Sequence, residues 1–169
     1  MKALVFKGVN QPFSYEEVAN PEAEDGWVVV EVKAAAFNHR DNWITKGMYP
    51  NMQAIADPAI LGSDGAGLVG DREVIINPNI DWGDDDRFPL PEYEILGMTE
   101  RGTFAEQVKI RASHVVDKPA HLTFEQAAAL PLGGLTAYRV LFSRCKAQPG
   151  EKVLISGVGG GVALFACQF

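Results

Sequence analysis

The chain has 169 residues, of which 47% are hydrophobic and 22% are charged, a composition typical of an ordinary globular protein. Its formal net charge of −7 argues against nucleic acid as a partner, since phosphate binding needs clustered Lys and Arg side chains. The two cysteines, Cys145 and Cys167, have no Cys-x-x-Cys spacing, which excludes a thiolate zinc site. The N-terminus shows no signal-peptide pattern and no apolar run could span a bilayer, so we expect a cytoplasmic protein without membrane contacts.

Short strand patterns occupy the first two thirds of the chain. Apolar and β-branched residues predict strands at residues 2–6 and 27–35, the first at the edge of its sheet. The sequence LGSDGAGLVG at residues 61–70 holds four glycines, which predicts a strand pressed against other backbone or forced through a bulge. Many short strands separated by turns favour a β-barrel-like body. Three further strands are expected at residues 73–79, 102–110 and 114–119, and a surface loop at residues 80–97.

The pattern becomes helical near Thr123. Thr123 followed by Gln126 predicts a capped helix start. Pro131 then predicts a break, with a second helix from about Gly134 to Arg144. The apolar run KVLIS that follows predicts a strand. We therefore divide the chain into a substrate domain and a second unit, at residues 1–123 and 124–169.

The sequence GVGGGV lies between this apolar run and a short apolar helix pattern. Glycines allow a tight turn and a close approach of pyrophosphate, and a helix N-terminus offers free N–H groups to it. The sixth position holds valine where the dinucleotide motif usually has a small residue, and a buried turn without a ligand is the alternative. The residues predicted to bind a dinucleotide here are Gly157, Gly159, Gly160, Gly161 and Val162.

Taken in order, several segments resemble the medium-chain dehydrogenase/reductase superfamily. The most specific pairing is AAALPLGGLTAYR followed by PGEKVLISGVGGG, and the others are MKALVF, EVKAAAFNHRDNW, ILGSDGAGLV and YEILGMTERGTFAEQV. The resemblance implies a GroES-like β-barrel catalytic domain followed by the start of a Rossmann nucleotide-binding domain, a fold that moves from α+β to α/β along the chain. Family members are longer, so we expect this chain to be the N-terminal part of a protein that forms a homodimer.

The same resemblance bears on metal binding. Zinc-dependent relatives carry a Cys-His-x-Asp segment, a Gly-His-Glu segment and a later Cys. The corresponding positions here hold Asn38, Ser63 and Leu132, which cannot supply three nitrogen or sulfur ligands to a catalytic zinc. The chain therefore resembles the zinc-free, quinone oxidoreductase-like branch. That branch implies no zinc, NADP(H) rather than NAD(H), and hydride transfer to a quinone, an enone or a similar activated carbonyl or alkene.

Without a Lewis acid, hydrogen-bond donors must stabilise the charge that develops on the substrate. The resemblance places Asn38, Arg40 and Asp41 beside the nicotinamide, and we take them as the catalytic candidates. Asn and Asp are also common at helix starts. This segment could therefore be a helix cap without a catalytic role.

The remaining candidates concern the ligand pockets. The resemblance places Thr136 near the nicotinamide and its ribose phosphate, although Thr136 could simply bond back within its own helix. Tyr49 and Ser63 are candidates for the substrate pocket. The non-enzymatic alternative is a GroES-like domain that acts as a binding or assembly module, because an unpaired apolar strand favours association.

Overall fold

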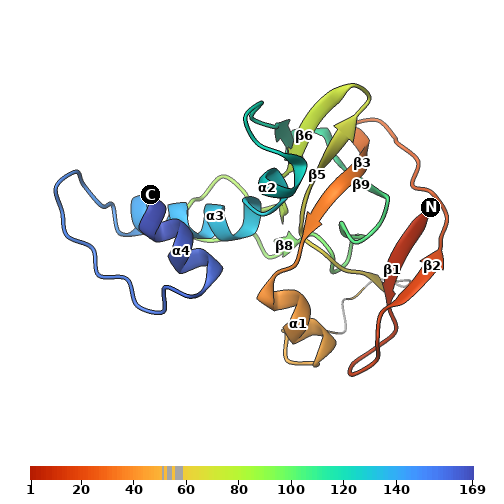
Figure 1. Ribbon diagram of the computed structural model, residues 1–169, viewed down its shortest axis with the longest axis horizontal. Helices are drawn as coiled ribbons and strands as arrows, with labels where there is room; N and C mark the ends of the chain where they lie inside the picture. Colours follow the sequence, from red (N-terminus) through yellow and green to blue (C-terminus); the bar gives the residue numbers. More distant parts are fainter. Residues whose placement is uncertain (51, 53–54, 56–58) are drawn as a thin grey trace.

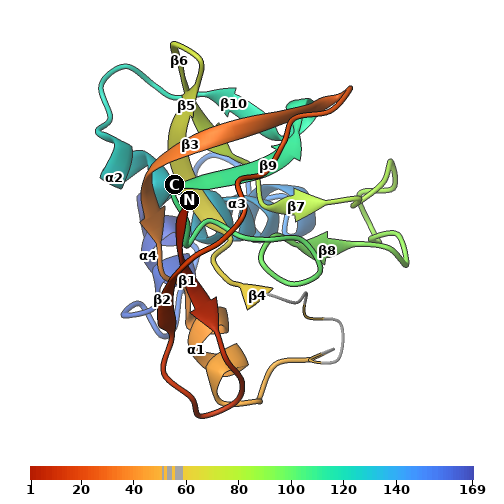
Figure 2. The ribbon, with the colours of Figure 1, turned by 90° about the vertical axis from the view of Figure 1, so that its right-hand side faces the viewer.

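The computed structural model describes residues 1–50, 52, 55 and 59–169. Its body is built from antiparallel β-sheets, with α1 at one end and α2 against one face (Figures 1 and 2). No helix in these ranges is both long and apolar enough to cross a membrane. The strands are β1 (Lys2–Phe6), β2 (Ser14–Glu17), β3 (Trp27–Ala36), β4 (Ala59–Ile60), β5 (Asp64–Val69), β6 (Arg72–Ile76), β7 (Asn79–Ile80), β8 (Glu94–Ile95), β9 (Gln107–Arg111) and β10 (Val115–Asp117). The helices are α1 (His39–Thr45), η2 (Ala112–His114), α2 (Phe124–Ala128), α3 (Pro131–Tyr138), η3 (Arg139–Arg144) and α4 (Gly161–Gln168).

The largest sheet has the strand order β10-β6-β5-β3-β9 and curls strongly into a half-barrel (Figure 2). Its inner face follows from the period of two in strands, which places alternate side chains on the same side. In β9, for example, Val108 and Ile110 are buried while Lys109 between them is half-buried. They form one apolar core with Val30 of β3 and with Val74 and Ile76 of β6.

A smaller sheet has the order β2-β1-β4 and packs beside α1. β1 is therefore its central strand, and the expectation of an edge strand was wrong. Both neighbours pair with β1 in antiparallel register, through Leu4 with Tyr15 and Val5 with Ile60. The sequence pattern of β1 gives no sign of this, because the partner strand β4 follows more than fifty residues later.

The glycines of β5 allow a close approach of backbone. A Cβ on Gly67 would lie 2.0 Å from the carbonyl oxygen of Glu31 in the neighbouring β3. Opposite this point the β3 register shifts between Val32 and Ala34, which marks a bulge. The strand is thus both pressed against other backbone and placed opposite a bulge. At its other end, Gly70 (φ +59) begins the two-residue turn into β6.

The helical segment differs from its prediction at one boundary. α2 forms as expected, with Gln126 donating its N–H to the Thr123 hydroxyl, and packs Ala127 and Ala128 on the sheet. α3 begins at Pro131, not at Gly134. Proline lacks an N–H and has a fixed φ, both of which suit the first position of a helix. Pro131 therefore starts the second helix where we expected it to separate two helices.

The predicted strand at residues 152–156 does not form, and no described strand pairs with it. Leu154 in this segment is 97% exposed. A strand needs a neighbouring edge for its backbone hydrogen bonds, and the nearest packed element here is helical. α4 returns to α3, where the ring of Phe165 lies 3.1 Å from the position of a Cβ on Gly133. α3, α4 and their connecting loop project from the side of the body opposite β1 and β2 (Figure 1).

Candidate active site

The start of α1 positions the first candidate residue. Asn38 is the N-cap, with extended backbone (φ −112, ψ 156). Its backbone N–H donates to Asp41 Oδ2 at 2.8 Å, so the Asp41 carboxylate closes the first turn. Asn38 and Asp41 therefore do cap the helix, as the alternative to a catalytic role predicted. It leaves the side chain of Asn38 available for a second role.

The Asn38 side chain points to the start of β5. Its Nδ2 donates to Ser63 Oγ at 3.3 Å and to Asp64 Oδ2 at 3.1 Å. The same Asp64 carboxylate accepts the backbone N–H of Leu132, at 3.1 and 3.2 Å from its two oxygens. Because Pro131 has no N–H, Leu132 carries the first N–H of α3 that can be bonded. Asp64 therefore joins α1, β5 and α3.

Asp64 was not among our predicted site residues. The signal in the sequence was its place beside Ser63 in the segment that resembles Gly-His-Glu, but only the fold brings it to Leu132. Asp64 is 1% exposed. Burial raises the pKa of its carboxyl to about 6, and the hydrogen bonds from Asn38 and Leu132 oppose this rise. Ser63 is fully buried and its hydroxyl accepts the Asn38 amide; its place in the substrate pocket stays a prediction.

Arg40 and Asp41 form a buried pair next to this cluster. Their exposures are 5% and 0%, and Arg40 Nη1 lies 3.8 Å from Asp41 Oδ1. Burial raises the pKa of Asp41, while the N–H of Asn38 and the charge of Arg40 lower it. Buried charges are normally paired, and Asp41 is paired with Arg40 and with the Asn38 N–H. Asp41 thus contacts both Asn38 and Arg40.

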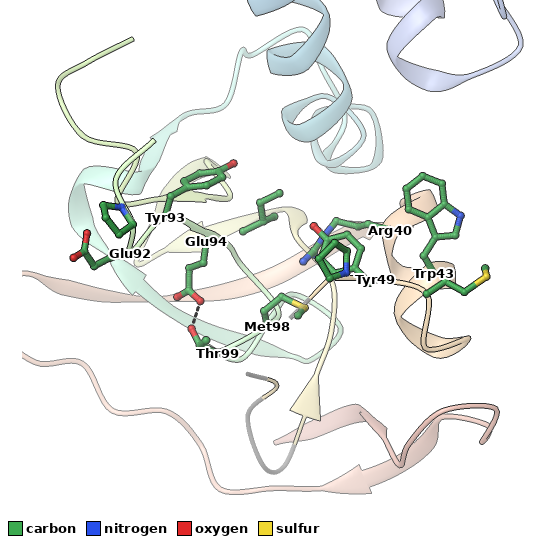
Figure 3. Close-up of a pocket in the computed structure, with 12 residues that line it drawn as sticks. Arg40, Trp43, Tyr49, Glu92, Tyr93, Glu94, Met98 and Thr99 are labelled. Atoms are coloured by element: carbon green, nitrogen blue, oxygen red, sulfur yellow. Dashed lines mark hydrogen bonds between the residues drawn. The ribbon is translucent and has the colours of Figure 1, made fainter. Parts of the chain in front are cut away.

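Arg40 faces a cavity of about 630 Å³ between α1 and the segment around β8 (Figure 3). Its guanidinium stacks on the Tyr49 ring at 5.0 Å, and Nη1 donates to the carbonyl oxygen of Leu96 at 3.1 Å. In Figure 3 Arg40 and Tyr49 lie on one side, opposite Tyr93 and Glu94, and Glu94 accepts a hydrogen bond from Thr99. The lining residues include Arg40, Trp43, Tyr49, Tyr93, Ile95 and Met98.

A second cavity of about 510 Å³ adjoins the first. Tyr93 and Ile95 line both, and the second cavity continues along α3 past Leu132 and Thr136. The Thr136 hydroxyl donates to the Leu132 carbonyl at 2.7 Å, which is the bond within the helix that we named as an alternative. Thr136 is nevertheless exposed on the cavity wall. Its oxygen keeps an acceptor lone pair for a ligand.

The three positions that resemble zinc ligands do come together. Asn38 bonds to Ser63, and both lie beside Asp64, which binds the N–H of Leu132. An amide, a hydroxyl and an alkyl side chain are not the imidazole and thiolate donors that a catalytic zinc requires. Within the described ranges, no group of three or more His, Cys, Asp or Glu side chains is placed to hold a metal ion. The donor set therefore does not fit a catalytic zinc.

The glycine turn is open to solvent. Gly157 has φ +67, and the N–H of Gly160 bonds back to its carbonyl at 3.0 Å. A Cβ on Gly159 or Gly161 would meet no described atom within 4 Å. The N–H groups of the first turn of α4 have no partner within their helix by geometry. The turn is thus an accessible cradle of the kind that a pyrophosphate fits.

Comparison with known proteins agrees with this architecture. Residues 24–120 match the family described as "Alcohol dehydrogenase GroES-like domain". The chain belongs to this family. It is thereby a member of the medium-chain dehydrogenase/reductase superfamily, as its segments predicted.

Three similar proteins illustrate the assignment. A "zinc-type alcohol dehydrogenase-like protein" of Schizosaccharomyces pombe is 36% identical over 175 residues, covering 94% of this chain and 48% of that protein. A solved NAD-dependent alcohol dehydrogenase has a TM-score of 0.90 at 35% identity, covering 99% of this chain and 54% of the other. The quinone oxidoreductase of Thermus thermophilus, also solved with NADPH, has a TM-score of 0.78 at 30% identity, covering 99% and 49%.

The chain spans about half the length of these relatives. The whole chain therefore corresponds to about one half of each relative, and the sequence identities are high enough to show that the fold is shared. The relatives are oxidoreductases by name.

Proposed function

We propose that the chain forms the substrate-binding part and the first nucleotide-binding turn of a zinc-independent, NADP(H)-dependent oxidoreductase. Hydride would pass to a quinone, an enone or a similar activated carbonyl or alkene. The observation that supports this most is the cluster of Asn38, Ser63 and Asp64 at the start of α3. It occupies the positions of a catalytic metal site with donors that do not suit zinc, although the S. pombe relative is named as zinc-type.

The chain's own residues have distinct roles in this proposal. The glycine turn at residues 157–161 would hold the pyrophosphate on backbone N–H groups. Thr136 and Leu132 would line the place of the nicotinamide, which supplies the hydride. Asp64 and Asp41 fix the orientation of Asn38 by the bonds described above. Arg40 supplies a cation in the adjoining cavity, where negative charge on a substrate oxygen is stabilised electrostatically. We also propose a homodimeric, cytoplasmic whole protein.

The test is a titration of the purified chain with NADPH, followed by the quenching of its tryptophan fluorescence. We expect saturable binding that Gly159→Ala weakens about tenfold. The added methyl group meets no protein atom within 4 Å but occupies the space that the pyrophosphate needs. NADH serves as the comparison, and weaker binding of NADH is expected.

Gly134→Ala is the matched control, since a Cβ there is also free of contacts and lies on α3 away from the turn. Its affinity for NADPH should equal that of the wild type. Equal affinity of Gly159→Ala and the wild type would remove the turn from the nucleotide site. No saturation at millimolar NADPH would contradict nucleotide binding by this chain.

One observation favours a second candidate function. The segment at residues 152–156 exposes Val153 at 53% and Leu154 at 97%, and no described strand pairs with it. Exposed apolar segments of this kind mark sites of protein association. In this alternative the chain is a non-enzymatic binding or assembly module that retains the GroES-like half-barrel. Absence of NADPH binding together with self-association would support it.

A further inference from the structure

The second half of β3 has one free edge. Residues 31–36 pair with β5 on one side, whereas the pairing with β9 on the other side stops at Glu31. The chain just before β9 turns away to β1, and its last bond to β3 runs from the Val32 N–H to the Glu106 carbonyl. Among the described residues, no strand lies beside residues 33–36 on this side. An edge of this kind is ready to pair with another strand.

A groove of about 550 Å³ lies along this free edge. One wall is β3 with the residues that follow it, including Ala34, Ala35 and Phe37, and the other wall is formed by β1 and β2, including Leu4 and Tyr15. Phe37 and Tyr15 are 63% and 69% exposed. Apolar side chains beside an unpaired strand edge are the features that bind an extended segment by strand addition.

The same chain contains a strand-like segment that has no edge to pair with. Residues 152–156 have the composition of a strand, are unpaired in the part of the chain that the structure describes, and match residues 32–36 in length. This segment projects from the side of the molecule opposite β1 and β2, which form one wall of the groove (Figure 1). The segment therefore meets a groove only on another copy of the chain.

The charges at the groove set the direction of docking. Glu106 lies beside Val32 at one end of the groove, and Lys152 begins the segment. Both are exposed, and within the described ranges neither belongs to an ion pair. Lys2 and Lys33, which also line the groove, already have acidic partners. Pairing of Lys152 with Glu106 makes the segment run parallel to β3, and such complementary charges fix register and orientation.

We infer that residues 152–156 of one copy of the chain add as a strand to the free edge of β3 in a second copy. The backbone of the segment bonds to residues 33–36, and its apolar side chains cover the exposed rings of Phe37 and Tyr15. Segment and groove are different surfaces on opposite sides of the molecule. Each contact therefore leaves one groove and one segment free, and the copies associate head to tail. Nucleotide binding plays no part in this contact.

The test mixes two variants, each of which lacks one half of the contact. Leu154→Asp damages the segment and keeps the groove, whereas Ala35→Arg fills the groove at an exposed position of β3 and keeps the segment. In sedimentation velocity we expect the wild type to associate beyond the dimer and each variant alone to have a dissociation constant raised at least about twofold. The equimolar mixture should form a complex of one molecule of each variant, because one intact contact remains.

Two results would overturn this contact. One is a mixture that sediments like the separate variants, and the other is a wild type that stays monomeric at about 1 mM. Ala120→Arg makes the same change as Ala35→Arg in the exposed loop between β10 and α2 and should associate as the wild type does. If Ala35→Arg does not fold, Tyr15→Arg replaces it, since Tyr15 is largely exposed on the opposite wall.

Charge reversal tests the direction of docking. Glu106→Lys and Lys152→Glu should each weaken association, because each places like charges opposite one another. The double variant restores the pair with its signs exchanged and should recover the association of the wild type. Equal association of both single variants and the wild type contradicts the parallel docking, as does a double variant no stronger than the single ones.

Discussion

Asp64 is the residue on which most of the site geometry depends. Its carboxylate accepts the amide of Asn38 and the backbone N–H of Leu132, while Asp41 and Arg40 lie near enough to act on its charge. Buried carboxylates with two donors are held in a single orientation. The orientation of Asn38 therefore depends on the protonation of Asp64 as well as on its position.

The pKa of Asp64 leads to a prediction about stability. Burial raises this pKa from 3.8 to about 6, so the folded protein binds the proton more tightly than the unfolded chain. Stability is then highest at acid pH and falls as the pH rises from about 4 to about 6. Relative to Asp64→Asn, the wild type should lose at most about 3 kcal/mol of unfolding free energy over this range.

Urea unfolding of both proteins at a series of pH values measures this difference. Asp71→Asn, at the exposed turn between β5 and β6, provides the control. The difference in unfolding free energy between it and the wild type should stay constant with pH. A constant difference between wild type and Asp64→Asn from about pH 4 to about pH 7 would show that the carboxyl is not perturbed by burial.

Residue types in the sequence identified part of this site. Arg40 and Tyr49 line the first cavity and Asn38 lies close by at the start of the same helix, because a short motif keeps its neighbours together in any fold. Asp64 was missed, since its partners lie 26 residues before it and 68 residues after it. Trp43 and Tyr93 were missed for a different reason. An aromatic residue that lines a cavity has the same sequence pattern as one in a core.

At the scale of the elements, β3 and β5 approach each other very closely. The bulge in β3 brings the Glu31 carbonyl to the place where a Cβ on Gly67 would stand, at 2.0 Å. Neither strand can move freely, because each pairs with another strand on its far side. Only glycine is compatible with this crossing.

Gly67→Ala should therefore destabilise the fold by at least about 3 kcal/mol, the upper end for overpacking. Gly134→Ala makes the same change in α3 without any contact and should stabilise the protein by about 0.5–1 kcal/mol. Thermal unfolding followed by circular dichroism compares the two. A Gly67→Ala protein that melts with the wild type would show that β3 and β5 can separate there.

The elements were largely predictable where local signals decide them. The strands expected at residues 2–6 and 27–35 and the Thr123 cap appeared where the pattern placed them, whereas the strand expected at residues 102–110 forms only from Gln107. Pro131 was misread because a proline inside a helix pattern looks the same whether it breaks a helix or begins one. The structure decides in favour of a start, since Asp64 of β5 provides the acceptor for the following N–H.

On the scale of the whole molecule, the exposed segment at residues 152–156 stands out. Val153 and Leu154 face solvent, with Leu154 at 97% exposure. The composition of this segment predicted a strand, and that prediction was wrong, because a strand forms only beside a pairing partner. Exposed apolar side chains of this kind promote association.

We expect the chain to self-associate. Leu154→Asp should raise the dissociation constant measured by analytical ultracentrifugation at least about twofold, because it removes apolar surface and adds charge. Phe88→Asp, at an exposed position in the loop between β7 and β8, is the matched control and should sediment as the wild type does. Identical sedimentation of Leu154→Asp and the wild type would exclude this segment as the contact.

The bond between Asp64 and Leu132 also limits how the two sides of the molecule can move. α3 carries α4 and with it the glycine turn, whereas Asp64 belongs to the half-barrel. A change in the tilt of α3 must either lengthen this bond or displace the carboxylate, and the carboxylate is also the anchor of the Asn38 amide. Tilt of the helix and rotation of that amide are thus mechanically coupled through a single side chain.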